Sequence, residues 1–115
     1  MQFPDRKYLM TGAYEFSCAE RSTADLLLRL NALGGWNWRL GDSHWYGDYA
    51  ACVPFPGVRI RICDFPRTTE NGYRYRADIR TSADSATAMA TVDAAFRRLL
   101  GEIAAHDIRE IEWFD

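Results

Sequence analysis

Apolar and polar residues alternate with a period of two along several short stretches of the chain, which is the pattern of a strand with one buried face. The clearest stretch is VRIRICDF, residues 58–65, where Val58, Ile60 and Ile62 share one face and arginines occupy the other. The same alternation, bounded by glycine, proline and asparagine turns, predicts further strands over residues 8–17, 36–40, 45–54, 73–81 and 108–114.

Two longer stretches have apolar residues three and four positions apart, which is the spacing of one helix face. The first follows Ser22, a good N-cap, and ends at the Gly34–Gly35 pair, which suits the left-handed position after a helix. The second helix is predicted over residues 84–105, with Ser82 or Asp84 as its cap. Its core-facing stripe consists of Met89, Val92, Phe96, Leu99 and Ile103.

The predicted elements follow the order β-α-β-β-β-β-α-β within 115 residues, a length that suits one domain. Consecutive strands usually pair, and the Asn71-Gly72 turn favours a hairpin between the fourth and fifth strands, so we expect the middle four strands to form a meander. The sequence therefore predicts an α+β fold with a single domain over residues 1–115. It is a two-layer α/β sandwich with a mainly antiparallel sheet and two helices on one face.

The composition indicates where in the cell the protein resides and argues against nucleic-acid and membrane partners. The chain is 48% hydrophobic with a net charge of -2, so it has no overall attraction for nucleic acid or for anionic membranes. No apolar run approaches the roughly 20 residues of a membrane span, and the N-terminal residues lack the pattern of a secretion signal. Three cysteines, an odd number, fit free thiols buried as small hydrophobes in a reducing compartment. We therefore expect a cytoplasmic protein with no membrane partner.

Residues 35–49, GWNWRLGDSHWYGDY, hold three of the four tryptophans of the chain. Trp36 and Trp38 share one face of a predicted strand, so we expect them under the helices, because large aromatic side chains dominate core burial. Trp45 and Tyr46 lie beside the predicted turn and are harder to bury. They are candidates for exposed anchors that contact a partner.

His44 lies between Asp42 and Asp48, and a histidine near carboxylates can act as a general base. The turn itself explains Asp42, however, and no serine motif, phosphate loop or metal-ligand spacing accompanies His44. We therefore predict no catalytic residues, no metal and no cofactor. Asp48 is assigned to the same partner-binding surface as Trp45 and Tyr46.

Arginines occupy the polar positions of two neighbouring predicted strands. They are Arg59, Arg61, Arg74, Arg76 and Arg80, and Arg39 can join them. One interpretation is a basic platform for an acidic partner, either a protein surface or RNA phosphates. The other is a solvated face whose charges pair internally, because Asp78, Glu110 and Glu112 have the parity for cross-strand pairing. Tyr73 and Tyr75 have the opposite parity to the arginines, which argues against a base-stacking platform.

These observations favour a small non-catalytic cytosolic binding protein with a protein partner. A concrete form is a bacterial immunity-type protein that blocks a toxin. The alternative is a nucleic-acid-associated or regulatory domain that uses the arginine-rich sheet face, although nucleic acid is the less favoured partner. A third hypothesis is an enzyme without a recognisable motif, and the sequence leaves a homo-oligomer open.

Overall fold

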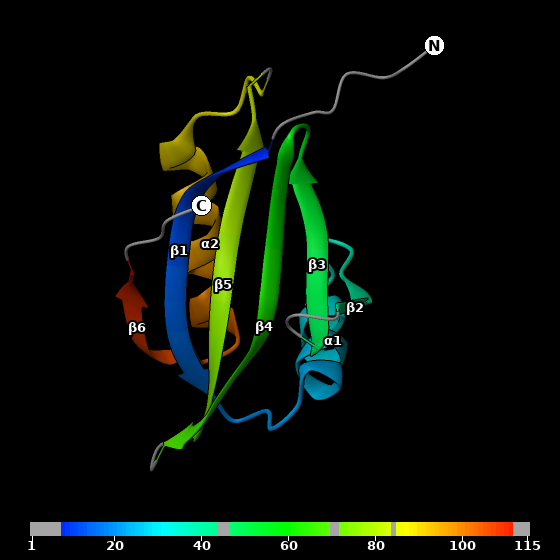
Figure 1. The fold of residues 1–115 in the computed structure, drawn as a ribbon, viewed down its shortest axis with the longest axis vertical. Helices are drawn as coiled ribbons and strands as arrows, with labels where there is room; N and C mark the ends of the chain where they lie inside the picture. Colours follow the sequence, from blue (N-terminus) through cyan, green and yellow to red (C-terminus); the bar gives the residue numbers. More distant parts are fainter. Residues whose placement is uncertain (1–7, 44–46, 70–71, 84, 112–115) are drawn as a thin grey trace.

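The predicted order of strands and helices is found in the computed structural model of the protein, which describes residues 8–43, 47–69, 72–83 and 85–111 (Figure 1). In chain order the elements are β1 (Tyr8–Cys18), α1 (Thr23–Ala32), β2 (Arg39–Ser43), β3 (Gly47–Phe55), β4 (Val58–Thr69), β5 (Gly72–Ser82), α2 (Met89–Glu102) and β6 (His106–Glu110). No helix in these described ranges is long and apolar enough to cross a membrane.

The six strands form one antiparallel sheet in the order β2-β3-β4-β5-β1-β6. The expected meander of the middle four strands is confirmed, and β1 lies between β5 and β6 rather than beside β2. Figure 1 shows both helices behind the sheet, with α1 near β2 and β3 and α2 behind β1 and β5. The protein is therefore the expected two-layer α+β sandwich with one face of the sheet uncovered by helices.

The hydrophobic core fills the space between the sheet and the two helices. Two aromatic pairs connect its parts: Phe16 stacks on Tyr75 with ring centroids 5.7 Å apart, and Tyr14 meets Phe96 of α2 at 5.4 Å. Each fully buried aliphatic or phenyl side chain contributes about 1.5–3 kcal/mol through removal from water. The fully buried residues include Leu26, Leu30, Val58, Ile60, Ile62, Ile79, Val92 and Leu100.

The first helix begins and ends as its sequence predicts. The Ser22 hydroxyl accepts a hydrogen bond from the Asp25 backbone N–H at 3.1 Å, which satisfies one of the free donors of the first turn. Gly34 has a φ of 75°, the left-handed conformation that glycine adopts without a steric penalty.

The second helix begins later than predicted. It starts at Met89, with Ala88 as an N-cap that makes no side-chain hydrogen bond. Ser82 cannot cap it, because Ser82 belongs to β5 and its backbone N–H donates to the Gly57 carbonyl at 2.8 Å. Asp84, the other predicted cap, lies outside the described residues.

The strand predicted over residues 36–40 is present but begins later, because β2 starts only at Arg39. The side-chain amide of Asn31 accepts from the Trp38 N–H at 2.8 Å and donates to the Trp38 carbonyl at 3.1 Å. This amide satisfies the backbone groups that a neighbouring strand would otherwise bind. Trp38 is buried as expected, Trp36 is half-buried against Trp38 and Phe55, and Leu40 is exposed.

Candidate binding surface

The face of the sheet opposite the helices is called the open face here, and Figure 1 looks onto it. The open-face side chains of β4 and β5 alternate with the core residues Ile60, Ile62, Tyr75 and Ile79. Strand register extends the assignment to the neighbouring strands. Among the described side chains, the charged residues of the open face include Arg39, Arg59, Arg61, Arg74, Arg76, Arg80, Arg109, Glu15 and Asp78.

One end of the open face holds a closed network of charges. Arg74 is buried and donates to Glu15 at 3.0 Å and to the Ser17 hydroxyl at 3.3 Å. Arg109 of β6 approaches the same Glu15 oxygen at 3.3 Å. The sequence assigned Arg74 to a partner-binding surface, but its burial and its two acceptors make it mainly a structural contact between β5 and β1.

A second pair lies in the middle of the sheet. The Arg61 guanidinium contacts the Asp78 carboxylate at 3.5 Å, which is the cross-strand pairing expected for Asp78. The same guanidinium lies 5.8 Å from the centre of the Tyr49 ring. Arg61 is therefore partly compensated by neighbours on β5 and β3.

Glu110 does not join the open face, in contrast to the sequence-based expectation. The register of β6 places Arg109 opposite Glu15, so Glu110 turns toward the helices. There it accepts from the Tyr14 hydroxyl at 3.3 Å and meets Arg97 of α2 at 3.5 Å. Glu112 lies outside the described residues.

Arg59 and Arg80 lie directly opposite each other on β4 and β5. Like charges in facing positions of an antiparallel pair repel each other. The Arg59 guanidinium lies 4.9 Å from the centre of the Tyr8 ring, a distance at which the ring face attracts a cation. Arg59 has no carboxylate partner among the described residues, and its Nε is buried without a hydrogen-bond acceptor there.

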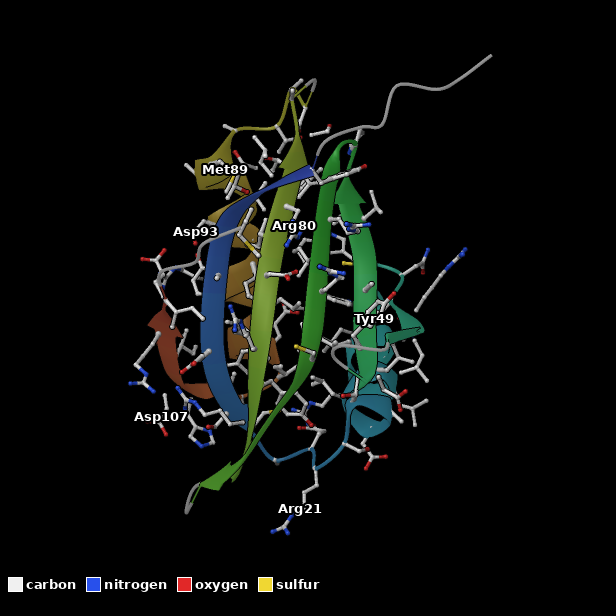
Figure 2. The ribbon with its side chains drawn as sticks, viewed as in Figure 1. Arg21, Tyr49, Arg80, Met89, Asp93 and Asp107 are labelled. Atoms are coloured by element: carbon white, nitrogen blue, oxygen red, sulfur yellow. The ribbon has the colours of Figure 1, made fainter. Side chains whose placement is uncertain are left out.

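Arg76 and Arg80 are both half-buried, and Arg76 lies between Cys63 of β4 and Glu15 of β1. Figure 2 shows Arg80 near the middle strands and Tyr49 over β3. The Tyr49 ring covers Gly41 of β2 so closely that a Cβ at position 41 would overlap it. Glycine at position 41, which has no Cβ, leaves room for this ring beside the neighbouring strand.

The placement of Tyr8 and Tyr49 on the open face could not be predicted from alternation alone. The alternation over residues 8–17 places Tyr8 and Met10 on the same side as Tyr14, but the pairing of β1 with β5 shifts register between Met10 and Gly12. Such a bulge moves the residues before it to the other face. Tyr49 shows the correct parity within its strand, since Ala50 and Cys52 are buried, but its contact with Arg61 depends on the register of β3 and β4.

The tryptophan-rich hairpin is described only in part. Trp45 and Tyr46, the predicted anchors, lie outside the described residues, and so does His44. β2 continues to Ser43, past its expected end at Leu40, so that Asp42 pairs with Asp48 of β3, and Asp48 is exposed. Tyr75 is buried as expected and donates to the Glu20 carbonyl at 2.7 Å, whereas nothing is described for the Tyr73 side chain.

Two of the three thiols are buried in the core. Burial raises the pKa of Cys52 to about 12, and burial together with the nearby charge of Glu20 raises the pKa of Cys18 to about 12. Both remain protonated at neutral pH and behave as apolar groups. Within the described part of the chain, no group of three histidine, cysteine or acidic residues is arranged to hold a metal ion.

A pocket of about 370 Å³ opens at the side of the sheet where β3 extends past β2. Its lining residues are Asn37, Arg39, Ala51, Cys52, Val53 and Arg59.

No protein-family model matches the chain, and no curated protein is significantly similar to it. The arrangement of the described residues offers cationic donors on an uncovered sheet face and, at one edge, a cavity between two arginines.

Proposed function

We propose that the protein is a small non-catalytic binding protein whose open face docks onto an acidic surface of a protein partner. The observation that carries this proposal is the charge of the open face. Its described side chains include seven arginines (39, 59, 61, 74, 76, 80 and 109) and two carboxylates, Glu15 and Asp78. Glu15 is shared by Arg74 and Arg109, and Asp78 contacts Arg61. An acidic partner would gain affinity and association rate from charge complementary to this arginine-rich face.

The arrangement of the tyrosines favours a protein partner over RNA. RNA-binding sheets present bare aromatic rings on which bases stack. On the open face the Tyr8 and Tyr49 rings already lie beneath the guanidinium groups of Arg59 and Arg61. A base would have to displace these cations, and the net charge of -2 opposes binding of phosphates elsewhere on the molecule.

An immunity-type protein that blocks a toxin is the concrete form of this proposal. A single compact sheet whose open face is uncovered can lie across the mouth of an active site and exclude substrate. Because the face is basic, the toxin would have to present carboxylates around that site. Trp45, Tyr46 and Asp48 would then extend the contact beyond the arginines.

The proposal is tested with a labelled polyglutamate chain as an acidic probe. Labelled duplex RNA of equal length tests the nucleic-acid alternative. Affinities are measured by fluorescence anisotropy across salt concentrations. The double variant Arg76→Gln/Arg80→Gln removes two open-face charges, and Arg21→Gln/Arg98→Gln removes two exposed charges elsewhere. Circular dichroism checks that each variant is folded.

We expect the wild type and the Arg21/Arg98 variant to bind polyglutamate with the same affinity, more tightly at low salt. The Arg76/Arg80 variant should bind at least about tenfold more weakly with a shallower salt dependence, since charge-assisted hydrogen bonds contribute about 1.5–3 kcal/mol each. Equal weakening in both variants would contradict a role for the open face. Tight RNA binding that is lost in the Arg76/Arg80 variant would favour the nucleic-acid alternative instead.

A further inference from the structure

The pocket at the edge of the open face results from a mismatch in strand length. The pairing of β2 with β3 ends at Arg39 and Ala51, whereas β3 continues to Phe55. The pairing of β3 with β4 also shifts register between Cys52 and Phe55. The exposed side chain of Val53 therefore lies where no β2 residue is paired beside it, and this leaves the hollow bounded by Arg39 and Arg59.

The pocket is lined by residues whose side chains carry N–H donors. They are Arg39, Arg59 and Asn37, and no carboxylate is among the described residues that line it. Neither Arg39 nor Arg59 forms an ion pair with any described residue. A ligand that fits this lining supplies negative charge and oxygen acceptors.

Arg59 is the lining residue whose surroundings most clearly favour binding of a hydrogen-bond acceptor. Tyr8 occupies one face of its guanidinium at 4.9 Å, and the N–H donors of a guanidinium point outward in its plane. The Nε is buried and has no acceptor in the described part of the chain. An unsatisfied buried donor is unfavourable, and a planar carboxylate matches the two parallel donors of an arginine edge.

We propose that the pocket between Arg39 and Arg59 binds a carboxylate group. Arg59 binds it through the N–H donors of its guanidinium, and Arg39 and Asn37 line the pocket beside it. As an extension of the proposed function, on which this second step rests, the carboxylate is the side chain of an aspartate or glutamate of the protein partner. Ala51 and Val53, which also line the pocket, provide apolar contacts for the methylene groups of that side chain.

The binding step is tested with free glutarate, whose carboxylates mimic an acidic side chain, and with inorganic phosphate as a different oxyanion. Binding to the full chain is measured by NMR titration of the arginine side-chain N–H signals. The variants are Arg59→Gln, which removes the charge, Arg59→Lys, which keeps the charge without the planar donor pair, and Arg98→Gln as the exposed control on α2. Thermal unfolding verifies that each variant is folded.

We expect glutarate to shift the Arg59 Nε signal in the wild type and in the Arg98 variant. Affinity should fall at least about tenfold in Arg59→Gln and by an intermediate factor in Arg59→Lys. Absence of a glutarate-dependent shift, or equal affinity in Arg59→Gln, would overturn the proposal. Equally tight phosphate binding with the same dependence on Arg59 would overturn the assignment to carboxylate.

A competition experiment between glutarate and polyglutamate tests the carboxylate pocket separately from the proposed binding of an acidic partner. If an acidic side chain of the partner enters the pocket, glutarate should compete with polyglutamate, and Arg59→Gln should weaken both ligands. Glutarate binding without competition would keep the carboxylate site and remove its role in partner binding. Loss of polyglutamate affinity in the Arg76/Arg80 variant alone would support the open face and contradict the pocket as its anchor.

Discussion

At the scale of single residues, burial separates polar groups that hold the fold from those that can act on a partner. Cys18 and Cys52 are enclosed in the core, whereas Cys63 is half-buried on the open face between Tyr49 and Arg76. Arg74 is buried on two acceptors, whereas Arg59 retains a donor without one among the described residues. The sequence shows three cysteines and many arginines, but it does not show which of them are enclosed by the fold.

The buried thiols predict a dependence of stability on alkaline pH. Folding raises the pKa of Cys52 from 9.0 to about 12, so the thiolate forms more readily in the unfolded chain. The stabilisation is complete below pH 9 and is lost as the pH rises toward 12. Over that window the wild type should lose up to about 1.4 kcal/mol per pH unit more than Cys52→Ala does.

Urea denaturation of both proteins on either side of pH 9 measures this difference. Tyrosine and lysine titrations are common to the two proteins and cancel in the comparison. Parallel curves for wild type and Cys52→Ala would show that this thiol titrates freely in the folded state. They would contradict its enclosure in the core.

At the scale of elements, a close backbone contact joins the end of β5 to the turn between β3 and β4. Gly57, in the turn between β3 and β4, has a φ of 76°. Its carbonyl accepts from the Ser82 N–H at 2.8 Å, and a Cβ at position 57 would lie 2.6 Å from the Ser82 hydroxyl oxygen. The end of β5 is therefore docked against this turn.

Alanine substitutions at three glycines separate the cost of a strained φ from the cost of a close contact at the new Cβ. Gly57→Ala should lower the free energy of unfolding by roughly 1–3 kcal/mol, because it introduces both a strained φ and a close contact. Gly34→Ala, with a φ of 75° but open space around its Cβ, should lower it less. Gly35→Ala, which meets neither obstacle, should change it little. Chemical denaturation gives the three values, and a Gly57→Ala protein as stable as Gly35→Ala would contradict the docking of β5.

The strand pattern and the first helix could be predicted from the sequence because each is encoded locally. Alternation identifies β4 and β5, and Ser22 and Gly34 mark the ends of α1. The late start of α2 and of β2 could not, because they depend on individual hydrogen bonds that the apolar pattern does not show. Ser82 is held by Gly57, and the Trp38 backbone is held by Asn31.

The candidate site shows the same division. Alternation correctly places the arginines of β4 and β5 on one face, but it cannot show which of them pair internally. That depends on the register of β1 with β5 and β6, which brings Glu15 to Arg74 and Arg109 and turns Glu110 toward α2. The bulge that carries Tyr8 to Arg59 is likewise set by strand pairing rather than by composition.

At the scale of the whole molecule, the charge is distributed unevenly. The chain has a net charge of -2, yet the described side chains of the open face have more arginines than carboxylates. Among the described side chains elsewhere on the molecule, carboxylates outnumber arginines, so the described part of the protein has opposite charge on different sides. Such a molecule is oriented as it approaches an acidic partner, and the arginine face arrives first.

The central claim is that the open face, and not general basicity, contacts an acidic partner. The most direct test is an arginine footprint: phenylglyoxal modification with and without polyglutamate, quantified at each arginine by mass spectrometry. Arg59, Arg76 and Arg80 should be protected, while Arg21, at the far end in Figure 2, and Arg98 on α2 should react at unchanged rates. Equal protection of all five, or protection confined to Arg21 and Arg98, would contradict the assignment of the open face as the binding surface.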